Sequence, residues 1–134
     1  MAETFQLEIV TPDKLVVNEA AEAAQIPARN GYIGVLPGHA PLITELGVGG
    51  ISYRTAGGER YLAVAWGFAE VLPDKVTILA ETAERADDID KERARKARER
   101  AEQRLRQGGD VDYDRAAAAL ERATTRLDVA AKSK

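Results

Sequence analysis

The sequence predicts an α+β protein, in which an N-terminal β-sandwich is followed by a C-terminal antiparallel two-helix hairpin. Through Glu84, short alternating segments rich in β-branched residues are separated by glycine and proline turns. From Arg85 onward, about fifty residues rich in alanine, arginine and glutamate contain no proline, which is the composition of helices. We therefore expect a β-sandwich domain at residues 1–84 and a helical domain at residues 85–134.

The strands are predicted from a period of two. Phe5, Leu7 and Ile9 alternate with polar residues, as in a half-buried strand. Similar segments follow, and turn sequences such as Asn30-Gly31 and Pro73-Asp74 divide them. We expect these further strands at residues 15–17, 23–27, 34–36, 50–54, 60–65, 67–72 and 75–80. Strands spaced this closely are typical of a sandwich or barrel. The common parity of Val64, Trp66 and Phe68 predicts that these three side chains share one face.

Two helices are predicted after the sandwich. Asp87 or Asp88 would cap the first, which would end near Gln107 because Gly108-Gly109 follows. Asp110 or Asp112 would cap the second, which would reach Ala131. The residues expected on the seam between the helices recur in steps of three and four. They are Ala94, Ala97, Ala101 and Leu105 on the first helix, and Ala116, Leu120, Ala123, Leu127 and Ala130 on the second.

The expected seam is rich in alanine, and this predicts a weak contact between stable helices. A buried methyl group contributes about 0.8 kcal/mol, whereas a buried leucine contributes about 2 kcal/mol. Alanine also has the highest helix propensity, so each helix would persist without its partner. Such an arm is suited to opening and docking again.

Charge and composition exclude several classes of protein. Residues 1–84 carry a net charge of −6 and residues 85–134 a net charge of +3. The absence of cysteine and the single His39 exclude a disulfide framework and argue against a metal centre. We find no signal peptide, no apolar run of about 20 residues that would insert into a membrane, and no phosphate-binding loop. No acid or nucleophile pattern accompanies His39, so we do not expect an enzyme.

Four motifs resemble those of the epsilon subunit of bacterial F-type ATP synthases, and the resemblance covers nearly the whole chain. The motifs are Val10-Thr11-Pro12-Asp13, Gly34-Val35-Leu36-Pro37-Gly38-His39-Ala40-Pro41-Leu42, Trp66-Gly67-Phe68-Ala69-Glu70-Val71 and Val76-Thr77-Ile78-Leu79-Ala80-Glu81. The resemblance implies a non-catalytic rotor subunit whose sandwich contacts the gamma subunit and the c-ring, with Tyr32 and His39 as rotor contacts. It also implies a helical arm that inhibits ATP hydrolysis when it extends into the alpha/beta catalytic head. The protein would be peripheral, on the cytoplasmic face of the bacterial membrane.

One motif of the arm is similar to that of epsilon subunits that bind ATP as a regulatory ligand. Ile89-Asp90-Lys91-Glu92-Arg93-Ala94 matches an Ile/Leu-Asp-x-x-Arg-Ala pattern at the start of the first helix. The spacing of Asp90 and Arg93 would place an acceptor and a planar donor on one helix face. The resemblance assigns ATP contacts, with no metal required, to these residues: Glu84, Ile89, Asp90, Arg93, Ala94, Arg100, Arg122 and Arg126.

Other interpretations remain open. An Asp-x-x-Arg pair on a helix is commonly a solvated ion pair that contributes a few tenths of a kcal/mol. The same rotor subunit could have an arm that does not sense ATP. An unrelated helical-arm adaptor or a nucleic-acid-binding protein is a further alternative, although acids alternate with the arginines and no aromatic stacking pattern accompanies them. We therefore expect no nucleic-acid partner.

Overall fold

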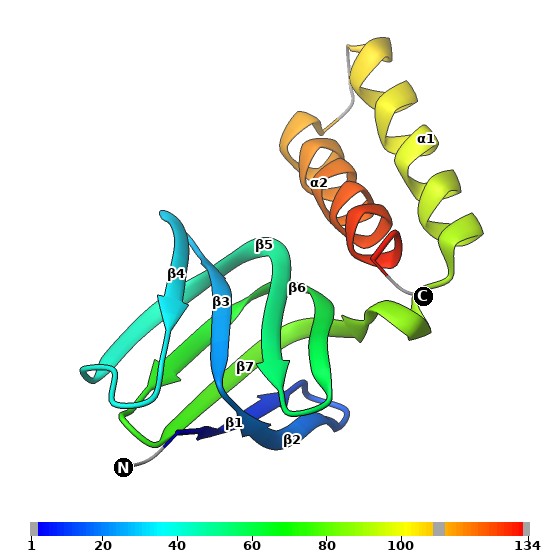
Figure 1. Cartoon of the computed structure of the whole chain (residues 1–134). Coiled ribbons are helices and arrows are strands. Elements are labelled where there is room, and N and C mark those ends of the chain that lie inside the picture. Colours follow the sequence, from blue (N-terminus) through cyan, green and yellow to red (C-terminus); the bar gives the residue numbers. More distant parts are fainter. Residues whose placement is uncertain (1–2, 109–111, 133–134) are drawn as a thin grey trace.

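The structure is a computed structural model that describes residues 3–108 and 112–132. Seven strands are followed by two helices (Figure 1), and this confirms the predicted fold class. The strands are β1 (Phe5–Val10), β2 (Leu15–Ala21), β3 (Ala23–Ala28), β4 (Gly31–Val35), β5 (Leu42–Thr55), β6 (Gly58–Val71) and β7 (Lys75–Arg85).

The strands form one sheet in the order β2-β1-β7-β6-β5-β3-β4. Neighbouring strands are antiparallel except for β1 and β7, which are parallel. All seven strands, including both edge strands, contribute buried apolar side chains to a single core. The sheet therefore curls around that core as a sandwich. Its largest fully buried side chains include Phe5, Leu7, Ile26, Ile51 and Tyr53.

Several strands are longer than the sequence predicted, and β5 and β6 differ most. The expected strands at 60–65 and 67–72 are one continuous strand, β6, and β5 also contains residues 42–49, for which no strand was expected. The long strands pair with each other along nearly their whole length. This pairing carries the strand through the glycines at positions 47, 49 and 50, although glycine is depleted in strands.

Trp66 and Gly67 reverse the face that β6 presents to the core. Leu62 and Val64 point into the core before them, whereas the odd-numbered Ala69 and Val71 do so after them. The cause is the positive φ of both residues, 53° at Trp66 and 125° at Gly67, which turns the chain over. The prediction that Val64, Trp66 and Phe68 share a face was therefore wrong, because Phe68 is exposed while Val64 is buried.

The first helix begins later than expected. A 3₁₀ turn (Ala86–Asp88) precedes α1 (Lys91–Gln107), and the cap of α1 is Asp90 rather than Asp87 or Asp88. The reason is Ile89, which is extended and buried, so that the helix begins only after it. The second helix, α2 (Tyr113–Ala130), is capped by Asp112 as one of the two alternatives predicted. Gly109 and Asp110 lie outside the described residues.

The two helices pack against each other, and α2 also packs against β5 and β6 (Figure 1). Alanines of the predicted seam are buried at positions 94, 101, 116 and 123, whereas Ala97, Leu105, Leu120 and Leu127 are only partly buried. Ala130 does not belong to the seam alone. It packs with Val129, Ala63, Ala86 and Ile89 in a second, smaller core between the arm and the sandwich. The arm is therefore folded onto the sandwich. Within the described residues, neither helix is long and apolar enough to span a bilayer.

Candidate functional site

Three of the predicted nucleotide residues meet between α2 and the sandwich. Arg126 of α2 donates a hydrogen bond from Nε to Oε1 of Glu84 on β7, at 2.5 Å. Each side chain remains about one third exposed, 35% for Arg126 and 33% for Glu84. Arg122 lies one helical turn before Arg126 and therefore faces the same side of α2. These three residues form what we call the arginine site.

Trp66 forms the floor beneath Arg122. The guanidinium carbon of Arg122 lies 5.2 Å from the centroid of the Trp66 ring, which is a cation–π distance. The sequence pattern placed Trp66 on one face with Val64, which is buried in the core. The turn-over of β6 moves the Trp66 ring to the arm side instead, where it is only partly buried. The only sequence feature that could have indicated this position of the ring is the Trp66-Gly67 pair, where the two predicted strands meet.

A hollow of about 60 Å³ lies at the arginine site. Its remaining lining comes from Ala63, Val64 and Ala65 on β6, Thr82 on β7 and Thr125 on α2. Pockets that hold ligands of nucleotide size occupy about 300–1,000 Å³. The site is therefore closed in this conformation, and a nucleotide would require the Glu84–Arg126 pair to separate.

The other residues predicted to contact ATP lie on α1 or just before it, apart from the arginine site. The Asp90 carboxylate accepts a hydrogen bond from the backbone N–H of Arg93 at 3.0 Å, and so acts as the helix cap. Asp90 therefore lies just before the helix, with its carboxylate directed at the first turn, which carries Arg93. That the Asp90 and Arg93 side chains share one face stays a prediction. One carboxylate oxygen caps the helix, and the other remains available as an acceptor.

The residues around Asp90 divide into packed and exposed positions. Ile89 and Ala94 are buried, with 7% and 1% exposure, so they serve packing. The side chains of Arg93 and Arg100 are exposed, and within residues 3–108 and 112–132 they form no hydrogen bond or ion pair. In the described residues no polar contact joins them to the arginine site. The antiparallel packing nevertheless places the start of α1 beside the end of α2 (Figure 1).

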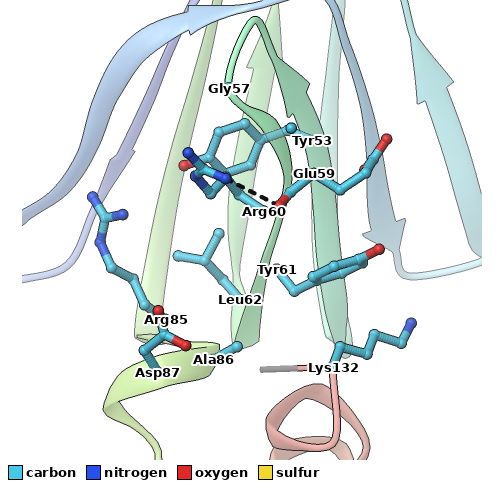
Figure 2. Close-up of a pocket in the computed structure, with 11 residues that line it drawn as sticks. Tyr53, Gly57, Glu59, Arg60, Tyr61, Leu62, Arg85, Ala86, Asp87 and Lys132 are labelled. Carbon is cyan, nitrogen blue, oxygen red and sulfur yellow. Dashed lines mark hydrogen bonds between the residues drawn. The ribbon is translucent and has the colours of Figure 1, made fainter. Parts of the chain in front are cut away.

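A larger cavity, about 870 Å³, lies elsewhere, between the β5–β6 hairpin, the end of β7 and Lys132 (Figure 2). Several of its polar groups are already engaged. Arg85 donates to the Val16 carbonyl at 2.7 Å, and the Lys132 ammonium lies 5.0 Å from the Tyr61 ring centroid. Tyr53 donates its hydroxyl to Glu19 at 2.6 Å. Burial, and then this hydrogen bond, raise the pKa of Tyr53 far above its ordinary value. No pattern in the sequence had indicated this cavity.

The two predicted rotor contacts lie at different places. Tyr32 on β4 lines a cleft of about 490 Å³ against α2, and its hydroxyl accepts from the Gly50 N–H at 3.2 Å. His39 lies in the loop between β4 and β5, beside the β6–β7 turn, where the Gly38 N–H donates to the Pro73 carbonyl at 2.8 Å. The structure does not bring these two side chains together.

A group of exposed apolar side chains lies near that loop and was missed by sequence reasoning. Ile43, Phe68 and Leu79 are 71%, 54% and 54% exposed. Phe68 is paired directly with Leu79 across β6 and β7, and Ile43 lies on the adjacent strand β5. We call these three residues the apolar face. Glu45 and Glu70, which pair with Phe68 and Ile43, border it.

Within the described residues, no three His, Cys, Asp or Glu side chains converge as metal ligands would.

Comparison with known proteins gives a consistent result along the chain. The family described as "ATP synthase, Delta/Epsilon chain, beta-sandwich domain" matches residues 4–86. The family described as "ATP synthase, Delta/Epsilon chain, long alpha-helix domain" matches residues 87–131. An ATP synthase epsilon chain of Koribacter versatilis (strain Ellin345) is 68% identical over 109 residues, which are 81% of this chain and 77% of that protein. Another, of Nitratidesulfovibrio vulgaris (strain DP4), is 51% identical over 107 residues, 80% of each.

Solved structures agree. A chain in the cryo-EM structure of the Euglena gracilis mitochondrial ATP synthase, OSCP/F1/c-ring in rotational state 1, superposes with a TM-score of 0.84 and 25% identity. The match covers 98% of this chain and 83% of that one. A chain of the Tetrahymena thermophila mitochondrial ATP synthase central stalk/c-ring has a TM-score of 0.54 at 11% identity over 96% of this chain and 95% of that one, and so shows the fold alone.

Proposed function

The chain belongs to the Delta/Epsilon chain family of ATP synthases as an epsilon subunit, and from this we propose how its two domains act in the central stalk. An epsilon subunit is an accessory subunit without catalytic activity. In our proposal the sandwich joins the gamma subunit to the c-ring, and the arm controls ATP hydrolysis by its position. The protein is peripheral, held at the cytoplasmic face of the bacterial membrane through the complex.

The apolar face supports the docking part of this proposal. Contiguous exposed apolar side chains bordered by charged ones mark protein–protein contact sites. Ile43, Phe68 and Leu79 meet this description, and the His39 loop lies just before β5 at the same end of the sandwich. We propose that gamma covers the apolar face and that His39 contacts the rotor beside it. Tyr32 faces α2 instead, and its rotor contact rests on the family resemblance alone.

The regulatory part is carried by one observation, the arrangement of Arg122 and Arg126 at the contact between arm and sandwich. Arg126 holds Glu84 in an ion pair, and Arg122 forms no hydrogen bond within the described residues. We propose that ATP separates the Glu84–Arg126 pair. The released carboxylate would accept from the adenine amine or a sugar hydroxyl, and the guanidinium would bind phosphate.

The arginines of α1 complete the proposed site. Arg93 and Arg100 are exposed on the helix that packs along α2. Phosphates held between both helices would bridge the weak alanine seam with charge-assisted hydrogen bonds. When ATP is about tenfold above its Kd, binding adds about 1.4 kcal/mol to the folded arm. The arm would be folded when ATP is plentiful and extended, inhibiting hydrolysis in the alpha/beta head, when ATP is scarce.

Calorimetric titration of the full chain with ATP, without added metal, tests this function. We expect a heat of binding in the micromolar to millimolar range, and about 10- to 100-fold weaker affinity in Arg93→Ala and Arg126→Ala, because each variant loses charged hydrogen bonds. Arg115→Ala is the matched control, since this exposed arginine of α2 lies in the first turn, away from the arginine site. Absence of heat would leave the alternative of an arm that does not sense ATP.

A further inference from the structure

Trp66 adopts a backbone conformation that is unusual for its residue type. Its φ is 53°, in the left-handed region that large side chains rarely adopt, and it is the only described residue other than glycine with a positive φ. Gly67 follows with φ 125°, and a Cβ atom there would lie 1.9 Å from the Leu79 carbonyl oxygen. Strain of this kind persists where the surroundings hold it, and it commonly marks a functional position.

The strained backbone has a clear effect on the side chain. Leu62 and Val64, on the same strand, point into the sandwich core, whereas the Trp66 ring lies against α2, under Arg122. A flat continuation of β6 would have placed the ring with Val64 in the core. The fold therefore presents an aromatic surface to the arm at the position where Arg122 arrives.

The contact with Trp66 differs in kind from the neighbouring ion pair. Glu84 occupies one hydrogen-bond donor of Arg126, the Nε–H group. A ring beneath a guanidinium instead holds the group through its charge and leaves its N–H groups at the edge. Within the described residues, Arg122 donates no hydrogen bond. Arg122 is thus fixed in place with its donors unpaired, which is the arrangement that bidentate binding of a phosphate needs.

We propose that Trp66 is a positioning residue, which docks α2 on the sandwich and holds Arg122 ready for a phosphate group of the nucleotide. The docking role stands on the contact between Trp66 and Arg122. The phosphate role rests on the proposed function.

A double-mutant cycle tests the docking role without nucleotide. Trp66→Gly removes the ring and relieves the left-handed φ, so this variant is expected to fold. Hydrogen exchange of the α2 amides in the full chain should be about three- to tenfold faster in Trp66→Gly, as for a lost cation–π contact. The same substitution should have no further effect in an Arg122→Ala background, and Trp66→Phe should restore most of the protection. Equal acceleration in both backgrounds would refute the docking role.

Titration with ATP tests the phosphate role on the same variants. Trp66→Gly should weaken ATP binding about three- to tenfold in the wild-type background and not in Arg122→Ala. Because Trp66 is the single tryptophan of the chain, its fluorescence should also change as ATP binds to the wild type. Unchanged affinity and fluorescence, with ATP binding measured by calorimetry, would overturn this role. If the wild type binds no ATP, both the phosphate role of Trp66 and the proposed sensing function fail. The hydrogen-exchange experiment still decides the docking role.

Discussion

Tyr53 shows how a single buried polar group depends on one partner. It is among the largest fully buried side chains, with 1% exposure, and its hydroxyl donates to the Glu19 carboxylate at 2.6 Å. A phenolate there would be both desolvated and next to a negative charge. The folded protein therefore holds Tyr53 in its neutral, protonated form.

The raised pKa of Tyr53 predicts a loss of stability in alkali. An unfolded tyrosine ionises with a pKa of about 10, whereas burial and Glu19 raise the pKa of folded Tyr53 well above that. The contribution of neutral Tyr53 to the free energy of unfolding is complete below about pH 10. It decreases as the pH rises further, because only the unfolded state then loses the tyrosine proton.

Denaturant unfolding between pH 8 and 11 checks this expectation. The free energy of unfolding should fall more steeply with pH in the wild type than in Tyr53→Phe. In absorbance titration of the folded protein near pH 10, the wild type and Tyr53→Phe should show the same change, because Tyr53 stays protonated. A smaller absorbance change in Tyr53→Phe would contradict the assignment.

Gly67 is the second residue on which the sandwich depends. Its φ is strained for any other residue, and a Cβ atom would collide with the Leu79 carbonyl. Gly67→Ala should therefore lower the free energy of unfolding by at least about 2 kcal/mol.

Gly34→Ala is the matched control, because a Cβ atom at this strand position meets no heavy atom within 4 Å. Denaturant unfolding of both variants gives the comparison. Similar stability of Gly67→Ala and Gly34→Ala would mean that β6 does not need the kink that the positive φ of Trp66 and Gly67 produces.

At the scale of the elements, the hinge between the domains is short, and it is anchored by buried Ala86 and Ile89. β7 runs to Arg85, the 3₁₀ turn follows, and Ile89 then packs with Val129 and Ala130 of α2. The start of α1 is thus tied to the end of α2 and to the sandwich together. An arm that extends must give up this second core, which consists mainly of small side chains.

Asp90 belongs to this scale because it has two separable roles, as the cap of α1 and as a proposed nucleotide ligand. Asparagine caps helices about as well as aspartate, whereas alanine costs about 1 kcal/mol. Asp90→Asn should keep the stability of α1 and still weaken ATP binding, since the amide lacks the carboxylate charge. Asp90→Ala should lower both.

Circular dichroism on heating and calorimetry on the same preparations separate the two effects. Asp112→Ala is the control, because it removes the equivalent cap of α2, which accepts from the Arg115 N–H at 3.1 Å, without touching the proposed site. Equal ATP affinity in wild type and Asp90→Asn would restrict Asp90 to capping.

At the scale of the whole molecule, the outer surface of β5 and β6 is divided into two parts. One side of β5 and β6 is covered by α2, and the apolar face lies beyond the kink at Trp66 and Gly67, where the strands present the opposite parity outward. The same kink thus separates the surface that receives the arm from the surface that we assign to gamma.

Loss of the apolar face should abolish docking without unfolding the chain. Ile43→Ser combined with Phe68→Ser removes two exposed anchors, and we expect at least tenfold weaker binding to a purified gamma subunit. Leu15→Ser, at a position 52% exposed on β2, should bind normally. Affinity for gamma and melting temperature are measured on the same variants, so that lost binding is distinguished from unfolding. Unchanged affinity of the double variant would place the gamma contact elsewhere.

The sequence by itself determined the features that depend on neighbouring residues. The period of the strands, the proline-free arm and the end of α1 at Gln107 follow from interactions within a few positions, so the α+β order was predictable. The cap of α2 was narrowed to Asp110 or Asp112, and the structure has Asp112. The family motifs added the membership that the comparisons confirm.

Only the tertiary structure decided which groups meet across long stretches of chain. The turn-over at Trp66, the pairing of Glu84 with Arg126 and the packing of Ile89 against α2 each depend on segments far apart in sequence. For the same reason the cap moved from the predicted Asp87 or Asp88 to Asp90, since the burial of Ile89 is a contact with the other end of the arm. Local periodicity carries no information about such contacts, because packing between distant elements fixes them.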